Sequence, residues 1–130
     1  MAQARGTFEV TLTPQFNDEE PQGSTLGRLS IDKTFRGDLE GTSKGEMLSD
    51  GTRTKGSAGY VAIERVTGAL HGRRGSFVLK HDGTMTRGAP ELTVRVVPDS
   101  GTGELAGLAG SMRIIVEPGQ HSYEMDYTLD

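Results

Sequence analysis

The sequence lacks cysteine and tryptophan and has few aromatic residues. With no Cys among its 130 residues, the chain has no disulfide, no thiolate metal ligand and no cysteine nucleophile. Aromatic residues make up 5% of the chain and hydrophobic residues 33%, so we expect a thin core. No apolar run approaches the roughly 20 residues that a membrane-spanning helix needs. The N-terminal stretch MAQARGTFEV also lacks the apolar segment of a secretory signal, and we therefore expect a cytoplasmic protein without a membrane partner.

An excess of basic residues is also missing. The net charge is −4, and the arginines and lysines are interleaved with acids, even where two stand together as Arg73 and Arg74. A nucleic-acid-binding domain usually carries a basic face, and aromatic side chains commonly stack on its unpaired bases. We therefore expect no nucleic-acid partner.

Motifs for metal and nucleophilic chemistry are missing as well. The three histidines, His71, His81 and His121, do not have metal-ligand spacing, and His71 and His121 are predicted to lie in turns. No G-x-S-x-G motif places a serine on a nucleophile elbow. We expect no metal and no cofactor.

Glycine, in contrast, is abundant, with 19 residues that recur between short β-type runs. The densest cluster is SGTGELAGLAGSM, residues 100–112. A dinucleotide-binding loop needs G-x-G-x-x-G between a strand and a helix, whereas this order is G-x-G-x-x-x-G and the strand-like SMRIIV follows it. We therefore interpret these glycines as structural: they let the chain cross a barrel mouth while Leu105 and Leu108 point into the core.

Alternation of apolar and polar residues predicts strands and no helices. The stretch TFEVTLT, for example, places Phe8, Val10 and Leu12 on one face. Eight such segments are predicted, at residues 7–13, 26–35, 37–50, 60–70, 76–81, 90–97, 111–117 and 121–130. We expect a long exposed loop between Pro14 and Ser24, and a turn at Asp82 and Gly83. This pattern favours one all-β domain over residues 1–130, an antiparallel barrel or sandwich, with closure preferred because it removes unpaired edges.

Several segments resemble known families. GTGELAGLAGSM is similar to the G-T-G-x-[LF]-x-G-x-x-G segment of allene oxide cyclase-type barrels. FRGDLEG, AGYVAIERVTGALHGRRGSFVLKHDGTM, VVPDSGTGELAGLAG and HSYEMDYTL resemble a family of small bacterial proteins classed only as a domain of unknown function. The resemblance runs from about Gly6 to Leu129. It implies a closed eight-stranded antiparallel barrel of the allene oxide cyclase-like superfamily and a homo-oligomer, and it brings no catalytic residues.

Glu64 and His81 are the candidate catalytic residues. Glu64 is a carboxylate in an otherwise apolar strand, on the face of Tyr60. If this face lines the lumen, burial raises the carboxyl pKa and suits it to acid-base work. The alternative is that Glu64 pairs with Arg95 or Arg28 on an outer or interface face. His81 shares a face with Phe77 and Leu79, and it either moves a proton in the lumen or bonds to a turn at the strand end.

Four further residues are candidate ligand-binding residues: Tyr60, Glu40, Arg95 and Tyr127. For Glu40 the alternative is an ordinary solvent-facing acid, and for Tyr127 it is a packing role with the hydroxyl at the surface or cavity rim.

Three functions fit these observations. In the first, the lumen binds a small, largely apolar molecule, because scarce aromatics and abundant Gly and Ala leave volume unfilled. In the second, an acid-base pair in the lumen makes the protein an isomerase, cyclase or lyase. In the third, the lumen is packed and the protein is a non-catalytic oligomeric scaffold. The sequence does not decide whether the protein is an enzyme.

Overall fold

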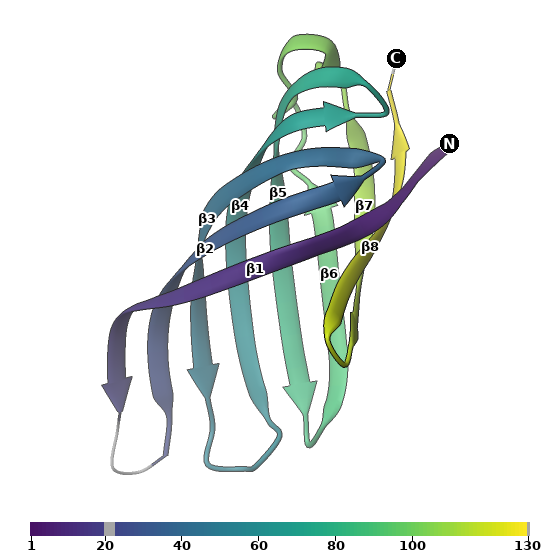
Figure 1. Ribbon diagram of the computed structural model, residues 1–130. Helices are drawn as coiled ribbons and strands as arrows, with labels where there is room; N and C mark the ends of the chain where they lie inside the picture. The colour runs from purple at the N-terminus through teal and green to yellow at the C-terminus, as the bar shows by residue number, and fades with distance from the viewer. Residues whose placement is uncertain (20–22, 130) are drawn as a thin grey trace.

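The computed structural model describes residues 1–19 and 23–129, and strands dominate it. The elements in chain order are β1 (Ala2–Glu19), β2 (Thr25–Gly37), β3 (Leu39–Gly51), β4 (Ala58–Leu70), β5 (Arg73–Thr86), β6 (Ala89–Val96), the short 3-10 helix η1 (Gly103–Leu105), β7 (Ala109–Glu117) and β8 (Gln120–Thr128). Each strand is antiparallel to the next, and β8 pairs back to β1 (Figure 1). The predicted closed eight-stranded antiparallel barrel is confirmed. In the described part of the chain, no helix has the length and apolarity to cross a membrane.

Period-two alternation decides which side chains fill the barrel. Phe8 of β1 pairs with Phe35 of β2, and Val66 of β4 pairs with Phe77 of β5. All four are at most 5% exposed. Because paired residues of neighbouring strands lie on the same face of a sheet, these pairs place one face of β1, β2, β4 and β5 in the interior.

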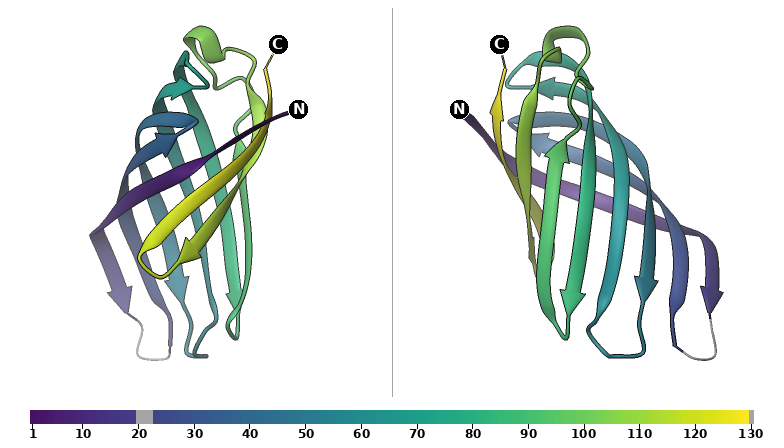
Figure 2. Two further views of the ribbon diagram at one scale, coloured as in Figure 1. Left: turned by 45° about the vertical axis from the view of Figure 1, so that its right-hand side comes forward. Right: turned by 180° about the vertical axis from the view of Figure 1, so that it is seen from behind.

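The two ends of the barrel differ in their closure. β1 continues to Glu19, but its pairing with β8 covers only Ala2–Phe8. The register between β6 and β7 contains one pair, Arg95 with Ser111. We call the ringed part the closed end. Beyond it, β1 to β6 continue as a curved sheet past the β7–β8 hairpin, and we call this part the open end (Figures 1 and 2).

Apolar packing fills the closed end. The segment around η1 crosses this end, as predicted, and buries Leu105 and Leu108 at 0% and 2% exposure. Gly103 and Gly107 bend this segment with φ angles of 59° and 88°, which side chains rarely tolerate. The Tyr123 hydroxyl accepts a hydrogen bond from the Leu39 N–H at 2.9 Å, which ties β8 to the start of β3.

The expected loop after residue 13 was wrong in its first half. β1 runs through Pro14 to Glu19, with a register shift between Pro14 and Phe16. Proline is acceptable there because β1 is past its pairing with β8, so the missing N–H breaks no ladder on that side. Residues 20–22 of the expected loop lie outside the described residues.

The expected turn at Asp82 and Gly83 was also wrong. β5 continues to Thr86, and the turn comes at Arg87 and Gly88, which have φ angles of 46° and 90°. Gly83 stays in the strand because the Tyr60 ring packs over it, where a β-carbon would collide with the ring.

His71 lies in the turn before β5, as predicted, but His121 does not lie in a turn. His121 belongs to β8, and its ring centroid lies 5.3 Å from that of Phe8.

We predict that Leu105→Ala lowers the free energy of unfolding by about 2–5 kcal/mol, because it leaves a cavity under the closed end. Leu26→Ala is the matched control, since Leu26 is 48% exposed, and it should change that free energy by less than about 0.5 kcal/mol. Urea unfolding measures both. Equal effects of the two variants would show that η1 does not cap the core.

Candidate functional site

Four polar side chains meet in the interior where the closed end gives way to the open end. They are Lys33 of β2, Ser43 of β3, Glu64 of β4 and His81 of β5, each at most 8% exposed. Oε1 of Glu64 accepts hydrogen bonds from Lys33 Nζ at 2.8 Å and from His81 Nε2 at 2.7 Å. Oε2 of Glu64 accepts from Ser43 Oγ at 2.5 Å. We call this group the Glu64 cluster.

Strand register brings these side chains together. Lys33 lies between the interior residues Ile31 and Phe35, and its pairing with Ser43 continues the same face onto β3. Gly45 pairs with Glu64, and a β-carbon at residue 45 would press on the backbone of Glu64. The bare glycine therefore lets β3 approach β4 closely beside the carboxylate.

The carboxyl of Glu64 is ionised. Burial acts to raise its pKa, but hydrogen bonds from His81, Lys33 and Ser43 and the positive charge of Lys33 outweigh burial and lower the pKa to about 2. The expected rise in this pKa is therefore wrong: desolvation was identified, but the three donors were not. Lys33 Nζ also lies 4.9 Å from the Phe8 ring centroid and 5.7 Å from that of Phe35, positions that favour a cation.

His81 uses only one of its ring nitrogens in the cluster. Nε2 is held by Glu64, whereas Nδ1 makes no hydrogen bond within the described residues. No fully buried side-chain nitrogen or oxygen among those residues lacks a partner, so Nδ1 keeps access to solvent. A neutral His81 that donates from Nε2 therefore presents the lone pair of Nδ1 as an acceptor.

An apolar cavity of about 320 Å³ lies on the inner face of the open end, next to the Glu64 cluster. Its lining residues are Met47, Ser49, Ala58, Gly59, Tyr60, Gly83, Thr84, Met85, Pro90, Glu91 and Leu92. The Tyr60 ring joins the two features, because its centroid lies 6.3 Å from that of His81. Burial raises the pKa of the Tyr60 phenol, and the charges of Glu64 and Asp82 raise it further, so the hydroxyl is a donor at neutral pH.

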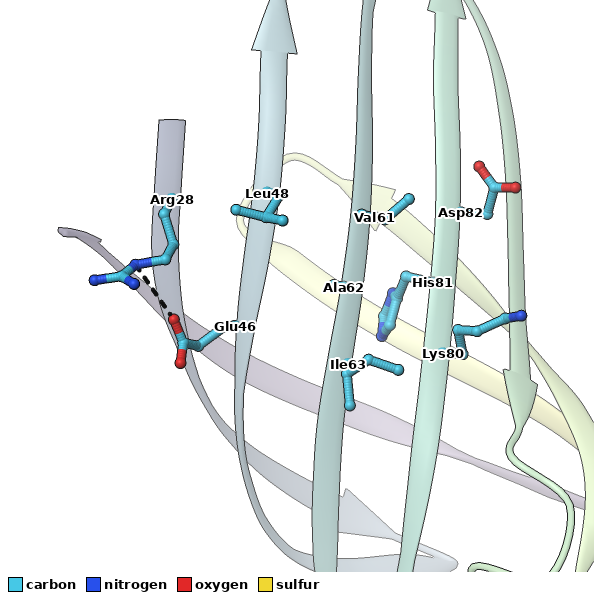
Figure 3. Close-up of a pocket in the computed structure, with 9 residues that line it drawn as sticks. All are labelled: Arg28, Glu46, Leu48, Val61, Ala62, Ile63, Lys80, His81 and Asp82. Atoms are coloured by element: carbon cyan, nitrogen blue, oxygen red, sulfur yellow. Dashed lines mark ion pairs between the residues drawn. The ribbon is translucent and has the colours of Figure 1, made fainter. Parts of the chain in front are cut away.

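A second hollow lies on the opposite, outer face of the same strands. This outer groove has a volume of about 420 Å³, and Leu48, Val61 and Ile63 form its apolar centre (Figure 3). Arg28 and Glu46 form an ion pair of 3.4 Å at one side.

The structure places three of the six candidate residues together: Glu64, His81 and Tyr60. Glu40 and Arg95 are exposed on outward-facing positions, and Tyr127 lies at the closed end, where its hydroxyl contacts Nδ1 of His71. The alternative that Glu64 pairs with Arg95 or Arg28 on an outer face does not occur, because Glu64 is buried among Lys33, Ser43 and His81.

Lys33 and Ser43 were missed by sequence reasoning, although their positions carried a signal. Lys33 is the one charged residue at an interior position between Ile31 and Phe35, and Ser43 stands at an interior position between Gly41 and Gly45. Across the described ranges, no group of three or more His, Asp or Glu side chains could hold a metal ion.

Comparisons with known proteins agree on one family. A family model described as a protein of unknown function, DUF3224, matches residues 4–127. The crystal structure of a DUF3224-family protein of unknown function from Shewanella oneidensis MR-1 is 53% identical in sequence, with a TM-score of 0.95 over 100% of this chain and 98% of that one. No functionally curated protein matches the chain. The allene oxide cyclase-like superfamily stays a prediction.

We predict that Glu64→Gln lowers the free energy of unfolding by about 3–5 kcal/mol, because it leaves Lys33 buried without its counter-charge. The double variant Lys33→Met with Glu64→Gln removes both charges and should recover at least about 2 kcal/mol of that loss. Urea unfolding at neutral pH measures these two variants and the single variant Lys33→Met. A double variant as unstable as the sum of its two single variants would contradict the ion pair.

Proposed function

The chain belongs to the DUF3224 family, whose function is unknown, and we propose that it binds a small, largely apolar molecule in the inner cavity of the open end. One observation carries this proposal: an apolar cavity of about 320 Å³ lies beside the buried Glu64 cluster, with the Tyr60 ring between the two. Ligand sites in proteins typically combine an apolar lining, a volume of roughly 300–1,000 Å³ and a few fixed polar groups.

The lining side chains support a ligand with an apolar body. Met85 and Leu92 are 43% and 42% exposed although they lie on inward-facing positions, and Leu12 across the opening is 44% exposed. A bound molecule would remove this apolar surface from water, which stabilises a complex by about 25 cal/mol for each Å² buried. The polar residues of the lining are Tyr60, Ser49, Thr84 and Glu91. His81 lies beside the cavity, next to Tyr60, and Nδ1 of His81 is a further group that could orient the ligand.

The distribution of packing favours binding over a purely structural role. The closed end is filled by side chains such as Phe35, Phe77 and Leu105, each at most 2% exposed. A scaffold would gain stability from filling the open end in the same way, yet Gly83, Ala58 and Ser49 keep the cavity wide.

Acid-base catalysis is the second candidate function, as an isomerase, cyclase or lyase. The hydrogen bond between Glu64 and Nε2 of His81 supports it, because a carboxylate that holds one imidazole nitrogen orients the other as a proton acceptor. A small molecule that copurifies with the protein would distinguish the two functions. Under catalysis, wild-type protein converts it and His81→Gln does not; under binding, both release it unchanged.

We predict that protein purified from its source carries a small molecule that native mass spectrometry detects. Ser49→Leu should lose this molecule, because Ser49 lines the cavity and pairs with Tyr60. Thr42→Leu is the matched control on the same strand, since Thr42 is exposed on the outer face and should leave the complex intact. Absence of a molecule from wild-type protein, or equal loss in both variants, would contradict binding in this cavity.

A further inference from the structure

We propose that the ligand of the inner cavity is a weak organic acid with an apolar body, and that its acid group binds at Nδ1 of His81. This inference rests on the proposed function and names the ligand class of the same site.

The cluster has no free acceptor for a cationic ligand. Both carboxylate oxygens of Glu64 are occupied, one by Lys33 and His81 and the other by Ser43. Lys33 would also repel a second cation. Nδ1 of His81 is the acceptor that the cluster leaves without a partner, and it favours a ligand that brings an acidic O–H.

An acid should bind more tightly than a neutral alcohol, because its proton can pass to Nδ1 and leave a charge-assisted hydrogen bond while the net charge stays the same. The charges of Lys33 and Glu64 cancel, so a proton on His81 gives the cluster a net charge of +1 beside an apolar cavity. Burying an unbalanced charge is unfavourable, and one ligand anion removes the imbalance. The proton moves from the ligand O–H to Nδ1, or is taken from solution when the ligand arrives as its anion, and a charge-assisted hydrogen bond then joins the two.

The charged and titratable groups that face His81 agree with this assignment. β4 contributes Glu64 and Tyr60, β2 contributes Lys33, and the residue paired with His81 on β6 is the apolar Val94. Glu64 stabilises the imidazolium, and the Tyr60 hydroxyl can donate to the second oxygen of a carboxylate.

Phenylacetate and phenylacetamide test the ligand class, because they have the same shape and differ in charge. We expect phenylacetate to bind about tenfold or more tightly than the amide near neutral pH. Calorimetry in buffers with different ionisation enthalpies should show that about one proton is taken up with phenylacetate and none with the amide.

His81→Gln is the decisive variant, because its amide can still donate to Glu64 but cannot be protonated. It should lose proton uptake and bind phenylacetate and phenylacetamide within about twofold of each other. His71→Gln at the closed end is the control and should keep both properties of the wild type. Equal binding of the acid and the amide to wild type would overturn the ligand class alone, whereas binding of neither probe to wild type would count against the cavity itself.

The outer groove carries a second inference from different residues: we infer that a second copy of this chain docks there. Leu48, Val61 and Ile63 lie side by side in the groove, at 50–53% exposure (Figure 3). Charges of both signs flank them on each side. Arg28 and Glu46 lie toward β2, and Asp82 and Lys80 lie on β5.

The arrangement of these charges is self-complementary. In the strand register, one row across the sheet reads Arg28, Leu48, Val61, Asp82, and the next reads Ser30, Glu46, Ile63, Lys80. A two-fold axis that runs parallel to the strands between β3 and β4 places Arg28 opposite Asp82 of a second copy. The same axis places Leu48 opposite Val61 of that copy, and it places Glu46 opposite Ile63 and one strand away from Lys80, as an isologous interface allows.

Exchanging two charges tests this interface while the composition and net charge stay constant. We expect wild-type protein to dimerise in sedimentation equilibrium over a concentration series. The double variant Arg28→Glu with Glu46→Arg keeps the ion pair within the chain but sets like charges against Asp82 and Lys80 of the second copy, so its dimer affinity should fall about tenfold or more. Adding Lys80→Asp and Asp82→Lys should restore it. A monomeric wild type would overturn the inference, and so would a dimer affinity that the charge exchange leaves unchanged.

Discussion

The carboxylate of Glu64 is the group on which the interior of this barrel depends. It is 0% exposed yet ionised, and donors from β2, β3 and β5 offset its desolvation. Because each donor comes from a different strand, the carboxylate also selects the register. A shift of one residue in β2, β3 or β5 would turn Lys33, Ser43 or His81 to the outer face and leave a buried charge unpaired.

The same cluster marks the boundary between two parts of the molecule. On one side, the eight strands close and apolar side chains pack around Phe35, Phe77 and Tyr123. On the other side, β1 to β6 continue without β7 and β8, and inward-facing Met85 and Leu92 stay partly exposed. The packed end supplies the stability that an open, incompletely filled end cannot, and it holds His81 and Tyr60 in place beside the cavity.

Much of the fold and half of the candidate residues were predictable from the sequence. Alternation identified the strands, put Glu64 on the face of Tyr60 and put His81 on the face of Phe77 and Leu79, since a period of two is a local property of the extended chain. Lys33 and Ser43 were missed because each is a polar residue at an interior position, and alternation of apolar residues does not mark such positions. The end of β5 was misplaced because Gly83 looks like a turn residue until Tyr60 packs over it.

The sequence by itself determined an all-β chain, its strand faces, the burial of Leu105 and Leu108 in the segment that crosses the barrel mouth, and the absence of thiol chemistry. Only the tertiary structure decided that Glu64 is a stabilised anion and not a carboxyl of raised pKa. The reason is that alternation specifies which way a side chain points, whereas its pKa depends on donors that residues 21 and 31 positions away bring to it. The difference between a packed and a hollow end likewise depends on where β1 and β6 lose their pairing partners. The sequence of a single strand does not specify this.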